Sequence, residues 1–426
     1  MKKFIVLVLI LISQNCNAND FSGYWEGKYV MNGSGWPVRL NITQTKEVVS
    51  VYLDLPNFVY NQESVEAKII QNIIEISMPF GLNTLKFKNI NGVLIPEDYQ
   101  ISTQFNKSKS PPYTIQPISW NTGNVTLHGS LYLPNSNKKH PLLIRLHGSG
   151  AGTRKQWEYR SWGDYFARKG IATVVFDRRG EGESNANNDD IGFNNLALDT
   201  VNLITKMKQR KDINSNKIIL NGGSQAAYIS LLAHSRSVDV DYMILSGAPS
   251  VNLIEQERQS LKFRMRQNNE SENAINQALG YQNLYFHYIR TGQNWNQLKI
   301  AAKKNQEKTW SKYTDHPTSE SDLKWWRENF GIYQPELLIP PIKIPMLILY
   351  GENDVITPPS IMISNFKYHL NESPNDSIKF VICPEVGHSL EEKFRKDQWE
   401  NIIFPQRSKK MFDEIDKWLN KYDLNI

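Results

Sequence analysis

The chain has 426 residues, of which 40% are hydrophobic and 22% charged, and its formal net charge is +6 at neutral pH. A chain of this length can bury more than one hydrophobic core. Its lysines are dispersed without forming a basic stripe, so the mild positive charge argues against a nucleic-acid partner.

The first eighteen residues have the layout of a secretory signal peptide. Lys2 and Lys3 precede an unbroken apolar run over 4–12, and a polar stretch then ends at Ala18, after which cleavage is expected. A membrane anchor and a lipid-modified Cys16 are less favoured, because the apolar run is far below the ~20 residues of a membrane span and the residues before the cysteine are bulky and polar. We therefore expect a periplasmic or extracellular protein with no stable membrane span.

Removal of the signal peptide would leave Cys383 as the single cysteine. One cysteine cannot form an internal disulfide, and no zinc-binding spacing is present. The folded protein is therefore expected to depend on ordinary burial of apolar side chains.

Residues 19–105 show a period of two, which predicts a small antiparallel β domain of roughly six strands. Val49, Val51 and Leu53, for example, alternate with polar residues. The stretch 106–112, which is rich in Lys, Ser and Pro, is the predicted linker.

The pattern changes at residue 113. Two strands are expected first, and short apolar strands then alternate with helices. Such strands are buried on both faces, which predicts an α/β fold with a mostly parallel sheet and helices on each side. The expected strands are near 114–120, 125–133, 142–146, 171–176, 217–220, 242–245, 345–350 and 378–382, and the expected helices are near 155–169, 193–211, 359–370 and 406–421, with another directly after Ser224.

A long segment without strand signals interrupts this alternation. Residues 251–341 show apolar residues at helical spacing, and Ser319 with Asp322 forms a capping-box pattern. The sequence therefore predicts a helical insertion that divides the α/β core into 113–250 and 342–426.

The sequence around Ser224 indicates a candidate nucleophile. An apolar strand leads to Asn-Gly-Gly-Ser-Gln-Ala-Ala, and a helical stretch follows. A sharp turn between a strand and a helix exposes the serine hydroxyl, and it requires small residues two positions before and after, here Gly222 and Ala226. Gly182-Glu-Ser184-Asn-Ala186 matches the same pattern, but no helix follows it. On this motif alone, an ordinary residue of a tight turn is the less favoured alternative for Ser224.

Those partners are expected at the carboxyl ends of later strands, where active sites of parallel sheets gather. Asp354 follows one late strand and His388 the next. A histidine can take the serine proton because it titrates near neutrality, and an aspartate can orient it. Glu352 is the rival acid, and a helix-capping role for Asp354 is the structural alternative, since Thr357 lies nearby.

The loop His147-Gly-Ser-Gly150 follows an earlier strand and is the candidate oxyanion hole. Glycines let backbone N–H groups approach a ligand, so Ser149 N–H, with Gly148 or Gly150 as its neighbours, is the expected donor. The second donor is Gln225 N–H at the helix start. We expect His147 to support the loop rather than to react.

Residues 113–423 resemble the α/β-hydrolase superfamily. The resemblance rests on this loop, on the stretch 177–184 (DRRGEGES), on the serine elbow and on the order Ser, Asp, His. One departure is Ala226 where glycine is commoner. Arg178 and Arg179 are expected in a solvated or salt-bridged loop rather than against an anionic substrate. The whole chain is similar to secreted bacterial esterases with a small N-terminal β domain.

The resemblance implies an eight-stranded, mainly parallel sheet and two-step hydrolysis of a small ester with a short to medium acyl chain. Ser224 would form an acyl-enzyme that water then cleaves, and no metal or organic cofactor is implied. The insertion would be a cap, and Tyr285, Trp325 and Trp326 would line the substrate pocket, unless they only pack its core.

Two other functions remain open at this stage. A peptidase or acyl-peptide hydrolase could use the same three residues, although relatives of that kind often carry a large propeller that residues 19–105 are too short to form. A non-catalytic binding protein could use the same scaffold, but no member of the triad is missing.

Overall fold

The computed structural model describes residues 20–31, 34–46, 48–56, 60–150, 152–186, 191–237, 239–370, 375–392 and 406–425. The predicted signal peptide, with Cys16, lies outside these residues. The chain divides into two compact units, Met1–Ser110 and Pro111–Ile426. In the ranges given above, no helix has the length and the apolar character needed to cross a membrane.

The first unit is a nine-stranded antiparallel sheet, in the order β4-β3-β2-β1-β9-β8-β7-β6-β5. Strands β4 and β5 stand at its two ends, yet only Glu66 separates them in the chain. The expected β domain thus has more strands than roughly six, because several are short. The strands are β1 (Gly23–Met31), β2 (Ser34–Gln44), β3 (Val49–Leu55), β4 (Tyr60–Val65), β5 (Ala67–Ile70), β6 (Ile73–Ile76), β7 (Leu85–Ile90), β8 (Val93–Pro96) and β9 (Phe105–Ser108).

Strand β9 occupies part of the predicted linker, 106–112. It pairs with both β1 and β8, so it belongs inside the first sheet. Among its residues, Phe105 is buried but Asn106 and Lys107 are exposed. The strand therefore lacks the apolar alternation that would have distinguished it from a linker in the sequence.

The second unit is built on an eight-stranded sheet in the order β10-β11-β13-β12-β14-β15-β16-β17. Strands β11 and β13 pair antiparallel, as do β10 and β11, whereas the pairs from β13 to β17 are parallel. The sheet is therefore mixed, which corrects the expected mostly parallel sheet. For the pair β10 and β11 the physical reason is the turn at Gly123 and Asn124, since a two-residue connection can join only antiparallel strands.

The elements of this unit agree closely with the expected ones. The strands are β10 (Tyr113–Thr122), β11 (Val125–Pro134), β12 (His140–Arg145), β13 (Ala172–Phe176), β14 (Ile213–Gly223), β15 (Tyr242–Ser246), β16 (Met346–Gly351) and β17 (Ile378–Cys383). The helices outside the insertion are α1 (Trp157–Ala167), α2 (Phe193–Lys208), α3 (Gln225–Arg236), α9 (Pro359–Leu370) and α10 (Lys409–Lys421), and a short pair of strands comprises β18 (Glu391–Glu392) and β19 (Gln406–Arg407).

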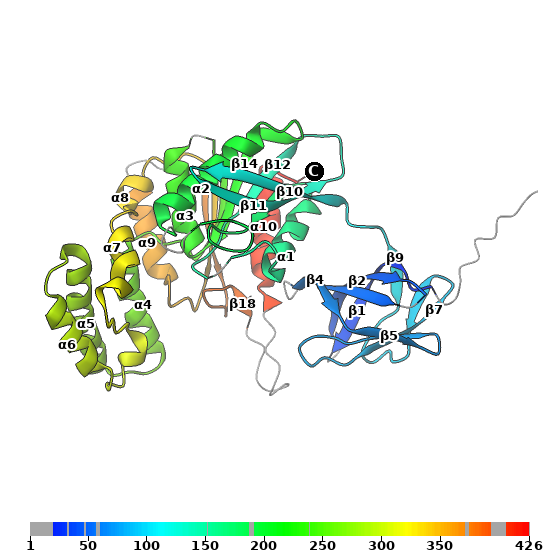
Figure 1. Cartoon of the computed structure of the whole chain (residues 1–426), viewed down its shortest axis with the longest axis horizontal. Helices are drawn as coiled ribbons and strands as arrows, with labels where there is room; N and C mark the ends of the chain where they lie inside the picture. Colours follow the sequence, from blue (N-terminus) through cyan, green and yellow to red (C-terminus); the bar gives the residue numbers. More distant parts are fainter. Residues whose placement is uncertain are drawn as a thin grey trace, which may run out of the picture. The chain divides into compact units, whose positions relative to one another are not determined.

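Helices cover both faces of this sheet (Figure 1). Alternate residues of one strand face opposite sides: Ile218 and Leu220 of β14 belong to the core beneath α2, α3 and α9, whereas Ile219 belongs to the core beneath α1 and α10. This double burial explains the nearly continuous apolar strands of the sequence.

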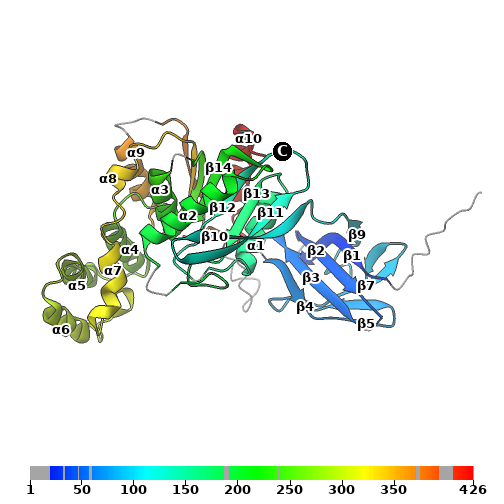
Figure 2. The ribbon, with the colours of Figure 1, turned by 45° about the horizontal axis from the view of Figure 1, so that its top comes forward.

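The insertion between β15 and β16 is helical, as expected, and in Figure 2 its helices α4–α7 form one group beside the core. It has its own core, in which Leu261, Ile275 and Tyr288 are buried. The predicted capping box is present, with reciprocal bonds between Ser319 and Asp322. Its helices are α4 (Leu253–Gln267), α5 (Glu272–Thr291), α6 (Trp295–Asn305), α7 (Lys324–Asn329) and α8 (Pro335–Leu338).

Candidate active site

Ser224 occupies the turn between β14 and α3. Its backbone has φ 56° and ψ −123°, a conformation that non-glycine residues rarely adopt. The small neighbours are required by space: a Cβ atom at Gly222 would overlap the methyl group of Ala226, and one at Gly223 would lie 2.5 Å from Ser246 Oγ. The crowding of small residues around Ser224 is thus explained by the turn that holds it.

Ser184, in the competing Gly-Glu-Ser-Asn-Ala motif, has a structural role. Its side chain is buried, its hydroxyl donates to Asp177 O at 2.7 Å, and its oxygen accepts from His128 N at 3.0 Å. It therefore joins β11 to the residue that follows β13, and its hydroxyl is engaged in this structural role.

Asp354 and His388 lie together at the ends of β16 and β17. His388 Nδ1–H donates to Asp354 Oδ2 at 2.8 Å, which sets the tautomer and leaves Nε2 as the acceptor. The Asp354 side chain is 0% exposed, and Oδ1 accepts from the N–H groups of Ile356 and Thr357 while Oδ2 also accepts from the Thr357 hydroxyl. Asp354 thus both organises its own turn and orients the imidazole.

The rival acid, Glu352, does not contact the imidazole. Its Oε2 accepts from Glu385 N at 3.0 Å, in the loop that leads to His388. Among the described residues, His388 Nε2 has no hydrogen-bond partner, although it is buried. That nitrogen is therefore available to a hydroxyl group in the adjoining pocket.

Two glycines that the sequence analysis did not single out leave the space that His388 and its loop occupy. A Cβ atom at Gly247, where φ is +53°, would lie 2.8 Å from His388 Cε1 and 3.1 Å from Thr357 Oγ1. A Cβ atom at Gly351 would collide with the carbonyl oxygens of Val386 and Gly387. Each glycine directly follows or ends a buried strand, and this position was the signal that could have identified them.

The loop 147–150 is supported from below by His147. Its ring is buried between Tyr159 and Phe176, and Nε2–H donates to Phe176 O at 2.7 Å. Burial lowers the pKa of His147 to about 3, so the ring is neutral at physiological pH. The structure therefore places His147 beneath the loop, where we expected a supporting residue.

Arg178 holds the same loop from the side. Its Nη1 donates to the carbonyl oxygens of Ser149 at 3.3 Å and Gly148 at 3.5 Å, and its Nη2 pairs with Glu181. The neighbouring Arg179 forms a buried, two-point ion pair with Asp199. Both arginines thus have structural partners, and neither lines the pocket that contains Ser224.

A pocket of about 270 Å³ lies beside Ser224. Gly148 and Gly150 line it, whereas the two expected oxyanion donors, Ser149 N–H and Gln225 N–H, belong to residues that adjoin its lining. Gln225 is the first residue of α3, so its N–H has no acceptor within the helix. The full lining is Arg145, Gly148, Gly150, Gln156, Glu158, Tyr159, Gly223, Ser224, Ser246, His388, Ser389, Glu391 and Arg407.

The three residues of the insertion that were expected to line the substrate pocket lie in two different places. Tyr285 and Trp326 line a second cavity, of about 190 Å³, between α4, α5 and the segment before α7. Trp325 instead packs edge-on against Phe193 and donates to Ile191 O at 3.3 Å. Trp325 is therefore a packing residue between the insertion and the core.

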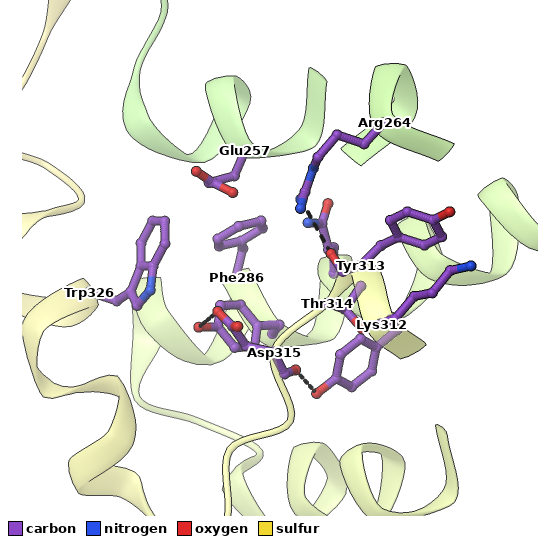
Figure 3. Close-up of a pocket in the computed structure, with 11 residues that line it drawn as sticks. Glu257, Arg264, Phe286, Lys312, Tyr313, Thr314, Asp315 and Trp326 are labelled. Carbon is purple, nitrogen blue, oxygen red and sulfur yellow. Dashed lines mark hydrogen bonds between the residues drawn. The ribbon is translucent and has the colours of Figure 1, made fainter. Parts of the chain in front are cut away.

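The second cavity has a mixed character. Figure 3 shows the carboxylate of Glu257 and the rings of Phe286 and Trp326 around one side, with Arg264 on the other. Burial raises the pKa of Glu257, while Arg264 acts in the opposite direction. The residues that line this cavity and those that line the pocket beside Ser224 do not overlap.

Comparison with known proteins assigns the family. A family model described as serine aminopeptidase, S33 (Hydrolase_4), matches residues 138–392, so the chain belongs to this family of α/β-hydrolases and is a hydrolase of the serine type. No curated protein matches the chain.

Several solved structures are similar in part. The α/β-hydrolase GrgF from Penicillium sp. sh18 is 17% identical, with 72% of this chain and 96% of that chain covered and a TM-score of 0.44. The Pyrococcus furiosus esterase Pf2001 is 15% identical, with 72% and 91% covered and a TM-score of 0.47.

Proposed function

We propose that this family member is a serine-dependent hydrolase of carboxylic esters that acts through Ser224, His388 and Asp354. The observation that carries the proposal is the bond of 2.8 Å between Asp354 and His388 Nδ1, together with a His388 Nε2 that has no partner among the described residues and shares a pocket with Ser224. A serine is a weak nucleophile until a base removes its proton, and this arrangement supplies the base and its orienting acid.

The reaction proceeds in two steps. His388 Nε2 takes the hydroxyl proton as Ser224 Oγ attacks the ester carbonyl, and it returns that proton to the leaving alcohol. Water, activated by the same nitrogen, then cleaves the acyl-enzyme and releases the acid. Asp354 stabilises the imidazolium cation during both steps.

The N–H groups of Ser149 and Gln225 bind the developing oxyanion. The α3 N-terminus adds partial positive charge at Gln225, and Arg178 holds the loop of Ser149 by its carbonyl oxygens. Loss of one such donor typically costs about 10²–10³ in rate.

The insertion 251–341 acts as a cap over the core. Tyr285 and Trp326 give it an aromatic cavity, and Trp325 fastens it to Phe193. The modest volume and the polar side chains of the pocket beside Ser224 favour short acyl groups over long ones. On the pattern of residues 1–18, we also propose that the chain is exported across the inner membrane.

Amide hydrolysis is the second candidate, because the description of the family is that of a serine aminopeptidase. The same three residues could cleave an amide, with His388 giving its proton to a leaving amine.

The test is hydrolysis of p-nitrophenyl esters from acetate to dodecanoate, with amino-acid p-nitroanilides beside them. We expect turnover of short esters that Ser224→Ala abolishes, whereas Ser184→Ala, if it folds, retains turnover. Turnover of anilides alone would replace the ester proposal with the amide one. Turnover that survives Ser224→Ala would contradict both.

A further inference from the structure

We propose that a partly buried ionic chain, Arg145–Glu158–Arg407, holds His388 in line with Ser224, so that these three are positioning residues. The inference rests on the proposed function. All three line the pocket beside Ser224, and they come from β12, α1 and β19.

The first end of the chain is attached to the strand that carries the nucleophile. Arg145 Nη1 donates to Asn221 Oδ1 at 2.9 Å, and the amide of Asn221 donates to Ile244 O at 2.9 Å. Asn221 lies in β14, three residues before Ser224. Arg145 therefore bonds to a side chain that is itself fixed between neighbouring strands.

The other end is attached to the loop that carries the base. Arg407 Nη1 donates to the carbonyl oxygen of Ser389 at 2.6 Å, and Ser389 directly follows His388. The next residue, Ser408, donates its N–H to Leu390 O at 2.8 Å. Arg407 and Ser408 thus hold the two residues that follow His388.

Glu158 joins the two ends. Its Oε1 accepts from Arg407 Nη2 at 2.7 Å and lies 3.6 Å from Arg145 Nη2. Both guanidinium groups also lie over the ring of Trp162, at 5.0 and 5.9 Å from its centroid. Two cations so close repel each other, and the carboxylate between them, in the first turn of α1, offsets that repulsion.

The consequence for catalysis is geometric. Asp354 fixes one ring nitrogen of His388 but does not by itself determine how far Nε2 lies from Ser224 Oγ. The three residues tie the loop of His388 to the strand of Ser224 through hydrogen bonds of their charged groups, which are the stronger kind, and through one longer ion pair between Arg145 and Glu158. A displacement near 1 Å of a reacting group can cost about 10²-fold in rate.

The test uses Arg407→Met and Glu158→Gln in the full chain, with the short ester that the wild type hydrolyses best. We expect kcat to fall by about 10–100-fold in each, with KM changed less than about threefold. Arg407→Lys should recover part of kcat, since lysine keeps the charge but lacks the fork. Because both residues act in one chain, the double variant should be no slower than about the slower single variant.

Arg210→Met is the matched control. Arg210 forms a two-point ion pair with Asp212 just before the start of β14, at the opposite end of the strand from Ser224. Its loss should leave kcat unchanged.

A second measurement does not depend on turnover. The proton that His388 Nδ1 donates to Asp354 should give a downfield NMR resonance, assigned by its absence in His388→Gln. We expect this resonance to shift or broaden in Arg407→Met and to persist in Arg210→Met. Unchanged kcat and an unchanged resonance in folded Arg407→Met and Glu158→Gln would overturn the inference. A wild type without Ser224-dependent turnover would refute the proposed function alone. The NMR resonance would still test whether Arg145, Glu158 and Arg407 position His388.

Discussion

At the scale of single residues, the turn at Ser224 requires its neighbours to have small side chains. Ser224 itself has a positive φ, and Gly222 faces the methyl group of Ala226 without space for another carbon atom. The strained conformation persists because the neighbours are small and because Ser224 N–H donates to Ser246 O at 2.9 Å. The position of the Ser224 hydroxyl therefore depends on the small size of its neighbours and on this backbone hydrogen bond.

This dependence leads to a prediction for Gly222→Ala. The added methyl group must displace α3 or the turn, so we expect a loss of about 1–3 kcal/mol in the free energy of unfolding and a marked loss of the proposed ester hydrolysis. Gly280→Ala is the control, since Gly280 lies inside α5 with open space around its Cα, where alanine is favoured. Urea denaturation and ester hydrolysis of both variants measure the two effects, and equal behaviour of the two would contradict this account of the turn.

His147 should make stability depend on pH. Burial lowers its pKa in the folded state to about 3, while the unfolded chain keeps a value near 6.5. The folded state thus binds fewer protons between these limits, so the stabilisation is complete above about pH 6.5 and declines as the pH falls towards 3. Between pH 7 and pH 4.5 the decline should be about 2–3 kcal/mol.

His147→Gln separates this effect from other titrations. The variant should be less stable than the wild type at pH 7, because a buried side chain with good packing is replaced. At pH 4.5 the difference in the free energy of unfolding between wild type and variant should be smaller by about 2–3 kcal/mol. Urea denaturation at both pH values measures it. A gap that stays constant would mean that His147 is not held neutral by burial.

At the scale of elements, most strands and helices of the second unit could be predicted because their signals are local. An apolar strand, a glycine turn and an amphipathic helix can each be recognised in a window of about ten residues. Ser224, Asp354 and His388 all follow such strands. The antiparallel β10–β11 hairpin could also have been predicted from Gly123-Asn124. Strand β9 could not, since its exposed polar residues carry no alternation.

The ionic chain Arg145–Glu158–Arg407 is a feature of the site that no local sequence pattern predicts. Its outer members are separated by more than 250 residues in sequence and meet only because β12, α1 and β19 surround one pocket. In the sequence, Glu158 and Arg407 each resemble an ordinary surface charge, and Arg145 is an isolated charge in an apolar strand. The partner of a charge is set by tertiary packing, which a single sequence does not display.

The insertion offers a prediction at this same scale. Burial raises the pKa of Glu257 on α4, so the folded state binds a proton more readily than the unfolded state. The contribution of Glu257 to stability is therefore most favourable at low pH, and it is lost as the pH rises through the pKa of the folded state. We expect Glu257→Gln to raise the melting temperature at pH 8 by more than at pH 4.

Glu272→Gln on α5 is the matched control. Hydrogen bonds from Arg266 lower the pKa of Glu272, so its shift has the opposite direction. Its amide variant should gain no stability at pH 8. A similar gain in both variants would indicate a general effect of removing negative charge.

At the scale of the whole molecule, the chain consists of two units that each bury their own core. In the first unit, Trp25, Leu40 and Phe87 are fully or almost fully buried within the nine-stranded sheet. In the second unit, Leu143, Ile219 and Leu347 are buried beneath α1 and α10. All the residues proposed for the reaction, and the Arg145–Glu158–Arg407 chain, lie in the second unit.

This division predicts that residues 111–426 fold and act without the first unit. A chain that begins at Pro111 starts just before β10 and keeps every described strand of the eight-stranded sheet. We expect it to unfold cooperatively and to retain kcat within about threefold of the full chain on the same short ester, since a unit with its own core can fold independently. Circular dichroism and ester hydrolysis test this directly, with Ser224→Ala in the shortened chain as control. If the shortened chain folds but loses kcat, the β unit contributes to the reaction, and its role would extend beyond that of an independent module.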